Sequence, residues 1–213
     1  MSQLKESSVV KAMLNASGKL VAFVAISIVF LLIVREITAP TIKAAEKANL
    51  LNNFNQVLSP HEYDNDLLTS GTTIEDIDYL KLLGSEQAIT VYRAYKKTKP
   101  VGAIFTTIAN NGYSGDISIL VAVYADGRIS GVRVLKHKET PGLGDKIDIN
   151  KSNWVLGFNG RKLRDDNPPR WAVKKDGGDF DQFTGATITP RAVIKAVEKG
   201  LLVINDIGVK LYE

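Results

Sequence analysis

Cysteine is absent from this 213-residue chain, and histidine occurs only as His61 and His137. The lack of thiols excludes disulfides, thiol nucleophiles and iron–sulfur clusters held by cysteine, and two histidines argue against a histidine-rich metal site. The formal net charge is only +4, with Lys and Arg scattered among Asp and Glu, so the sequence shows no footprint of nucleic-acid binding. Hydrophobic residues make up 45% of the chain, which is enough for one globular domain with an appendage.

Residues 20–34 contain no charge and consist mostly of Val, Ile, Leu, Phe and Ala. The apolar stretch reaches back to Ala12 if Lys19 extends its ammonium group toward lipid headgroups, and it then approaches the roughly 20 residues that cross a bilayer. The alternatives are a cleaved signal peptide and a buried core helix. Residues 35–40 lack the small-residue pattern of a good cleavage site, which favours an uncleaved membrane anchor.

The charges beside this segment do not decide its orientation. Three lysines precede it, and two lysines and an arginine follow it closely, so the count that underlies the positive-inside rule is nearly a tie. Beyond the anchor, apolar residues at helical spacing from 41 to about 58 predict an amphipathic helix that Pro60 ends. The predicted organisation is therefore a short N-terminus at 1–19, the anchor core at 20–34, a juxtamembrane amphipathic helix at 35–60, and a folded domain at 61–213.

The folded domain carries strong strand signals. Alternating or β-branched apolar runs occupy residues 89–94, 101–108, 117–124 and 129–135, and Asp126 with Gly127 between the last two runs is typical of a hairpin turn. A helical pattern follows position 190, with apolar residues recurring every three or four positions. These patterns predict an α+β fold: a single N-terminal transmembrane helix followed by a mostly antiparallel sheet with packed helices on one side.

The start of the last helix is preceded by Asp181-Gln182-Phe183-Thr184-Gly185-Ala186-Thr187. Thr189 is a suitable N-cap and Pro190 a suitable first helical residue, so we predict that the helix begins there. A phosphate held on Thr187 would lie beside the free N–H groups and the positive dipole end of this helix. The alternative is an ordinary junction between a loop and a helix.

Two further segments have the composition of binding loops. Glu139-Thr140-Pro141-Gly142-Leu143-Gly144 has two glycines and a proline, so its backbone is preset and can approach a flat ring or a phosphate closely; a plain surface turn is the alternative. Within Gly112-Tyr113-Ser114-Gly115, Tyr113 either stacks near a ligand or covers the edge of the core. Lys174 and Lys175 precede the Thr187 loop, where a cation would help to neutralise a phosphodiester. The alternative is that they are solvated surface lysines, and this alternative applies more strongly to Lys175.

Taken together, these motifs resemble the G subunit of the Rnf (Rsx) electron-transport complex. The resemblance runs from about Val91 to Gly200 and is carried by residues 171–190, residues 112–115 and residues 137–147, in the family's order. The family's Asp-x-x-Ser/Thr-Gly-Ala-Thr pattern is matched without departure. The residues that match it are Asp181, Thr184, Gly185, Ala186 and Thr187.

The resemblance implies an FMN-binding domain whose FMN is esterified through its phosphate to Thr187. In the family a separate flavin transferase recognises the pattern and transfers the FMN moiety from FAD. Thr140 and Leu143 are then expected to contact the isoalloxazine or ribityl part of the flavin. The wider expected cofactor-binding set also contains Glu139, Pro141, Gly142, Gly144, Tyr113, Ser114, Lys174, Asp181, Thr184, Gly185 and Ala186.

The same resemblance implies a flavoprotein subunit that relays electrons within an ion-translocating complex, with the other Rnf subunits and the membrane as partners and no nucleic acid. It implies a cytoplasmic N-terminus and a periplasmic flavin domain at the inner membrane of a Gram-negative cell. Two other interpretations stay open: the C subunit of the sodium-translocating NADH:quinone reductase, and a membrane-tethered scaffold without redox function. A hydrolase with Thr187 as nucleophile is disfavoured, because the sequence marks no activating base. No catalytic triad and no metal site are expected.

Overall fold

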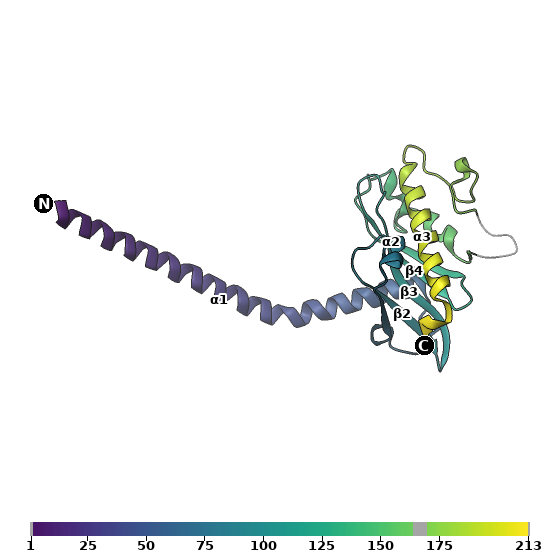
Figure 1. Ribbon diagram of the computed structural model, residues 1–213, viewed down its shortest axis with the longest axis horizontal. Helices are drawn as coiled ribbons and strands as arrows, with labels where there is room; N and C mark the ends of the chain where they lie inside the picture. The colour runs from purple at the N-terminus through teal and green to yellow at the C-terminus, as the bar shows by residue number, and fades with distance from the viewer. Residues whose placement is uncertain (1, 164–169, 213) are drawn as a thin grey trace. The chain divides into compact units, whose positions relative to one another are not determined.

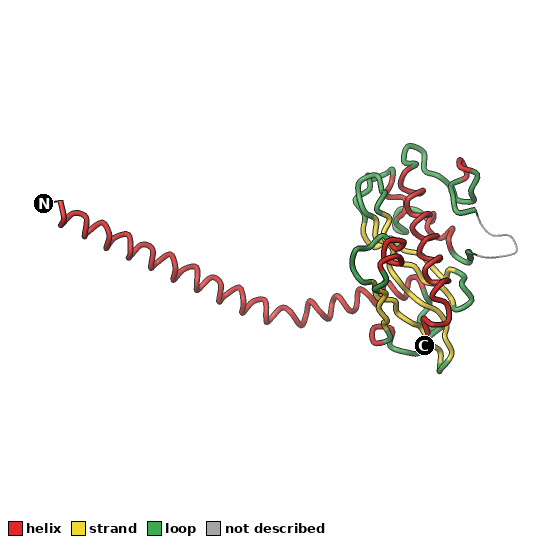
Figure 2. Tube along the Cα trace, in the orientation of Figure 1, coloured by secondary structure: helices red, strands yellow, loops and turns green. Residues whose placement is uncertain are grey.

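The computed structural model describes residues 2–163 and 170–212 of the chain, which divides into two units at residues 1–50 and 51–213 (Figure 1). The long helix α1 (Ser2–Val57) makes up the first unit, and its last turns belong to the second. The compact second unit therefore begins at Leu51, ten residues before the domain start expected from the sequence. It contains all the strands and the remaining helices, which Figure 2 distinguishes by colour.

Helix α1 is long and apolar enough to cross a membrane, as judged by its length and composition, over a stretch that begins at Met13. The apolar side chains of residues 20–34, where the anchor core is expected, are all exposed in the structure. The expected anchor and juxtamembrane segments form one continuous helix, which runs through Pro40 without a break. It ends at Val57, three residues before Pro60.

The second unit is built on a five-stranded sheet in which every neighbouring pair is antiparallel and the order follows the sequence. The four strands expected from the sequence are confirmed, each within two residues at either end, and the expected hairpin joins the last two. Helix α2 and the first strand were not expected. The elements are β1 (Gly71–Ile74), α2 (Ile77–Leu83), β2 (Ile89–Lys96), β3 (Lys99–Ala109), β4 (Ile117–Tyr124), β5 (Ile129–Lys136) and α3 (Ile188–Ile207).

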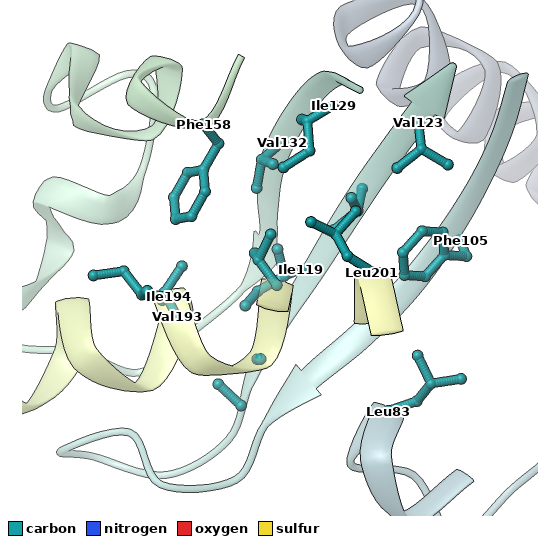
Figure 3. Close-up of a cluster of buried hydrophobic side chains, with 14 of the residues drawn as sticks. Leu83, Phe105, Ile119, Val123, Ile129, Val132, Phe158, Val193, Ile194 and Leu201 are labelled. Carbon is teal, nitrogen blue, oxygen red and sulfur yellow. The ribbon is translucent and has the colours of Figure 1, made fainter. Parts of the chain in front are cut away.

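Helices α2 and α3 cover one face of this sheet and enclose the main core (Figures 1 and 3). Phe105 of β3 and Ile119 of β4 are fully buried there and face α3. Gly200 allows the close approach, because a Cβ at this position would lie 2.7 Å from the Phe105 ring. The apolar stripe of α3 therefore docks on the sheet as its periodicity predicts.

The opposite face of the sheet is also covered, which differs from the expectation of helices on one side only. Phe54 and Val57, from the last turns of α1, are buried, and the Phe54 ring lies 4.7 Å from that of Tyr92. A Cβ on Gly131 of β5 would lie 2.8 Å from the backbone of Val57. The central strands are apolar on both faces, as Leu120 of β4 shows with 2% exposure, and both faces therefore need a cover.

Several 3-10 turns connect β5 to α3 and hold the loops that line the site. Trp154 and Phe158 lie in one of them and pack against Phe180, with ring centroids 6.5 and 4.6 Å from it. The Trp154 indole N–H donates to the carbonyl of Asp181 at 2.7 Å. This aromatic cluster fixes the beginning of the 181–187 loop. The 3-10 elements are η1 (Leu67–Thr69), η2 (Gly144–Ile147), η3 (Asn153–Phe158), η4 (Lys174–Asp176) and η5 (Gly208–Tyr212).

Tyr212, near the C-terminus, provides a pH test of this fold. Burial, and secondarily Tyr95, raises the pKa of Tyr212 from 10.0 to about 12. Because the folded state keeps the phenol neutral while the unfolded chain would ionise it, this stabilisation is complete below pH 10 and is lost as the pH rises through about 12. Tyr212→Phe keeps the edge-on ring contact with Tyr95. We expect its melting temperature to fall less than that of the wild type between about pH 9 and 11 in thermal unfolding followed by circular dichroism.

Equal losses in the two proteins would contradict this assignment. Some loss is expected to persist in Tyr212→Phe, because burial also raises the pKa of Tyr63. The comparison between the two chains, and not the absolute melting temperature, is therefore the measurement that decides.

Candidate functional site

A cavity of about 330 Å³ lies where the segments after β3 and β5 meet the start of α3. Tyr113 comes from the first segment, and Glu139 with Leu143 from the second. The third side is the loop that ends at Thr187. The two motifs that are far apart in the sequence thus share one cavity. Its complete lining consists of Tyr113, Glu139, Thr140, Leu143, Gly144, Gly185, Ala186, Thr187, Ile188 and Thr189.

The loop before α3 closes with a tight turn. The N–H of Ala186 donates to the carbonyl of Phe183 at 3.2 Å, and Gly185 adopts φ +81° at the third position of the turn. A positive φ at that position is what a type II turn requires, and it favours glycine. A Cβ on Gly185 would also lie 3.5 Å from the Leu143 side chain. The glycine therefore shapes the turn and keeps bulk out of the cavity beside Thr187.

Helix α3 begins at Ile188, two residues earlier than the sequence predicts, and its N-cap is Thr187. The prediction of Thr189 as N-cap and Pro190 as first helical residue is therefore wrong. Pro190 occupies the third helical position, which is still in the first turn, where a backbone N–H has no partner within the helix. The side chain of Thr187 makes no capping hydrogen bond in the described part of the chain. Thr187 thus stands directly at the positive end of the helix.

Glu139 is the buried polar centre of the site, with 4% of its surface exposed. The hydroxyl of Thr189 donates to its Oε2, and the backbone N–H of Ser114 donates to its Oε1 at 3.0 Å. Its own N–H donates to Nδ1 of His137 at 3.1 Å. One carboxylate therefore connects the loop that carries Tyr113, the segment after β5, and the first turn of α3.

The 139–144 segment has the preset backbone that its composition predicts. The carbonyl of Thr140 accepts from the N–H groups of Leu143 and Gly144, both at 3.1 Å, and Gly142 has φ +77°. Gly144 is also needed for space, because a Cβ there would lie 2.7 Å from Oε2 of Glu139. The turn therefore packs tightly on the buried carboxylate and presents Leu143 to the cavity.

Two ion pairs hold the segment that leads into the 181–187 loop. Nζ of Lys174 lies 2.6 Å from a carboxylate oxygen of Asp181, with both side chains exposed. Arg191, in the first turn of α3, binds Asp176 with two hydrogen bonds of 2.6 and 2.8 Å, and these bonds lower the pKa of the Asp176 carboxyl. The sequence reasoning missed Asp176 and Arg191, which lie 15 residues apart and whose pairing no local pattern indicates.

The structure separates the expected site residues into two groups. The group that lines the cavity consists of Tyr113, Glu139, Thr140, Leu143, Gly144, Gly185, Ala186 and Thr187. The group outside the lining consists of Ser114, Pro141, Gly142, Lys174, Asp181 and Thr184. Ile188 and Thr189 complete the lining and were not expected there. Lys174 lies outside the lining and pairs with Asp181. The described lining contains no cationic side chain, and the helix start is its positive element.

The cavity and the loops around it define the class of protein: residues 112–202, which contain all ten lining residues and α3 up to Leu202, match the family model of the FMN-binding domain. The match covers both motifs that meet at the cavity.

Curated relatives then identify the family. The chain is 46% identical over 199 residues to a protein of Vibrio atlanticus, a match that covers 91% of this chain and 93% of the relative. It is 42% identical over 200 residues to one of Shewanella amazonensis, covering 94% and 90%, and 47% identical over 165 residues to one of Aliivibrio fischeri, covering 78% and 77%. Each is named as the G subunit of an ion-translocating oxidoreductase complex. The chain belongs to this family of G subunits, which confirms the resemblance seen in the sequence.

The residues present fit an FMN group. The rim of the cavity is apolar and exposed, with Tyr113 68%, Leu143 42% and Ile188 46% accessible, which suits a flat aromatic ring. The uncapped helix start at Thr187 suits a phosphate, since backbone N–H groups there have no intrahelical partner. The apolar rim and the helix start lie in the same cavity, as a flavin with a phosphate on its side chain requires.

Proposed function

We propose that this chain is the membrane-anchored flavoprotein subunit of an ion-translocating oxidoreductase complex, and that it carries FMN through a phosphoester on Thr187. The observation that carries the proposal is the position of Thr187, which lines the cavity at the uncapped N-terminus of α3. A phosphate on its hydroxyl would be stabilised by the helix dipole and the free N–H groups.

We propose that a separate enzyme makes the attachment, since the described lining offers Thr187 neither a histidine nor a lysine as an activating base. A flavin transferase with FAD as substrate supplies this chemistry. The Thr187 oxygen forms an ester bond to the flavin-side phosphorus, the bond from that phosphorus to the bridging oxygen breaks, and AMP leaves. The hydroxyl proton passes to a base of the transferase or to solvent. The exchange replaces one phosphoanhydride bond by one phosphoester bond, and no oxidant or reductant takes part.

The protein's own residues bind and orient the group. Tyr113, Leu143 and Ile188 supply the apolar surface for the ring, and the turn with Gly185 leaves room beside the phosphate. FMN, when bound, supplies the transfer of one or two electrons. An ester at the phosphate keeps the cofactor bound while leaving the isoalloxazine electronics unchanged.

Membrane attachment and assembly follow from the first unit and from the family. Helix α1 is the anchor by length and composition, and the relatives are named as subunits of a complex. We propose that the other subunits of that complex are the redox partners, with the flavin domain on the periplasmic side and the N-terminus in the cytoplasm.

The mass of the intact chain, isolated from the membranes of its native host, tests the proposal. We expect one added FMN moiety on the polypeptide and a fluorescent band at its position in a denaturing gel. Peptide mapping should place the added mass between Asp181 and Arg191. A native chain with the mass of its amino acids alone, and without colour, would overturn the flavoprotein assignment and favour a scaffold without redox function.

A further inference from the structure

We propose that Glu139 and Thr189 form a positioning clamp that sets the place of Thr187 for flavin attachment. This Glu139–Thr189 clamp is the hydrogen bond from the Thr189 hydroxyl to the Glu139 carboxylate. It rests on the proposed attachment of FMN at Thr187, and it assigns a role to Thr189, which the attachment motif does not include. Neither residue reacts: the clamp acts on Thr187 through the backbone.

Both side chains of the clamp are buried, so water does not compete for their hydrogen bond. Thr189 has no exposed surface and Glu139 only 4%. Thr189 is the second residue of α3, two positions after Thr187, so the hydroxyl that binds Glu139 fixes the first turn of the helix on which Thr187 sits. Breaking this buried hydrogen bond would be costly, because it would leave Oε2 of Glu139 without a donor.

The second oxygen of Glu139 holds the facing wall of the cavity. It accepts the backbone N–H of Ser114 at 3.0 Å, next to Tyr113 on the cavity rim. A Cβ on Gly112 would lie 3.0 Å from the same oxygen. One carboxylate therefore sets the spacing between the side that carries Tyr113 and the side that carries Thr187.

The ionic contacts of the described chain do not explain this buried carboxylate. The described side chains, those of residues 13–163 and 170–212, form seven ion pairs, and Glu139 takes part in none of them. Its partners are a hydroxyl and a backbone N–H, both of which belong to cavity segments. We therefore assign to the Glu139 carboxylate the role of holding these two segments in place.

Placement matters because the Thr187 oxygen must reach a phosphorus atom held by another protein. Misplacing a reacting group by about 1 Å can slow a reaction by roughly a hundredfold. Loss of the Thr189 hydroxyl would let the first turn of α3 shift by part of this distance, while Thr187 itself would be unchanged.

The test measures the initial rate of flavin attachment to the full chain in detergent, with a purified flavin transferase and FAD, by fluorescence of the band in a denaturing gel. We expect Thr189→Val to be modified about tenfold more slowly than the wild type. Thr189→Ser keeps the hydroxyl and is expected to restore most of the rate. Peptide mapping confirms that the label is on Thr187 in each case.

A second pair of variants tests the clamp while Glu139 and Thr189 themselves stay unmutated. The Cβ of Gly144→Ala would lie 2.7 Å from Oε2 of Glu139 and 2.9 Å from the Thr189 hydroxyl, so it pushes the clamp apart. We expect it to slow attachment as Thr189→Val does. Gly157→Ala is the matched control, because a Cβ there meets no atom within 4 Å, and it should retain the wild-type rate.

A third control separates placement from stability. Thr107 is fully buried, and its hydroxyl lies 3.2 and 3.3 Å from the carbonyls of Leu83 and Ala196, outside the cavity lining. Thr107→Val removes a buried threonine hydroxyl in the same way as Thr189→Val. We expect a similar drop in melting temperature but an attachment rate within about twofold of the wild type.

The outcomes are distinct. A wild-type rate in both Thr189→Val and Gly144→Ala would overturn the clamp, and so would a Thr189→Ser or Thr107→Val chain as slow as Thr189→Val. If Thr189→Val does not fold, as its melting curve would show, Gly144→Ala against Gly157→Ala decides. A wild-type chain that takes up no flavin would contradict the proposed function itself and not the clamp alone.

Discussion

Thr187→Ala is expected to abolish covalent flavin while leaving the domain folded. Alanine has no hydroxyl to esterify, so the loss should be complete. Thr187 is half-buried at the boundary between a loop and a helix, makes no capping bond, and leaves no core cavity when it is shortened. The free energy of unfolding should therefore change by about 1 kcal/mol or less. Flavin fluorescence in a denaturing gel measures the first effect and thermal unfolding the second.

Two matched variants sharpen this result. Thr187→Ser keeps a hydroxyl at the same place and should still be modified. Thr184→Ala should reduce modification without abolishing it, because Thr184 is exposed in the turn and lies outside the cavity lining. A fluorescent Thr187→Ala band of wild-type intensity would refute the attachment site, and peptide mapping would then identify the residue that holds the flavin.

The central strands could be predicted because their sequence and their environment agree. Residues 117–124 are β-branched or apolar almost throughout, and they form the whole of β4, in the middle of the sheet. The edge strand β1 has only four residues, Gly71–Ile74, with one buried side chain among them. Its pairing with β2 creates its structure, and a stretch of that length carries no periodicity that could indicate it beforehand.

The second cover of the sheet was missed for a related reason. The last turns of α1 follow an apolar stretch of membrane-spanning length, so their apolar residues were assigned to a juxtamembrane amphipathic helix. Phe54 and Val57 are instead part of the core. The sequence contains their apolarity, but only the sheet, with residues such as Gly131 that make room for the helix, reveals what they pack against.

At the site, the local motifs were predictable and their mutual contacts were not. The glycine and the threonines of residues 184–187 indicate a turn that presents a hydroxyl, which the structure contains. Two threonines separated by one residue both fit an N-cap, and only the tertiary contact with Glu139, 50 residues away, determines that Thr189 is inside the helix. The charge of Lys174 and its position before the loop suit a phosphate ligand, but its ammonium group pairs with Asp181. Long-range partners decide such positions, and local spacing does not encode them.

The orientation of the anchor leads to an all-or-none prediction, and the absence of cysteine makes it simple to test. A single cysteine can be introduced on either side of α1 without a competing thiol. We expect Glu86→Cys, at an exposed position between α2 and β2, to react in intact cells with a maleimide that does not cross the inner membrane. Ser7→Cys, before the anchor, should stay unlabelled until the membrane is permeabilised.

The charge count gives this experiment its weight, because three positive charges on either side of the anchor leave the orientation undetermined by electrostatics. The cysteine-free parent is the control for unspecific labelling, and full labelling of both variants after permeabilisation shows that both thiols are accessible. The reverse pattern, with Ser7→Cys labelled in intact cells and Glu86→Cys protected, would place the flavin domain in the cytoplasm. FMN attachment at Thr187 would then have to occur in the compartment where free flavin is made, and a covalent bond would no longer be needed to retain the cofactor.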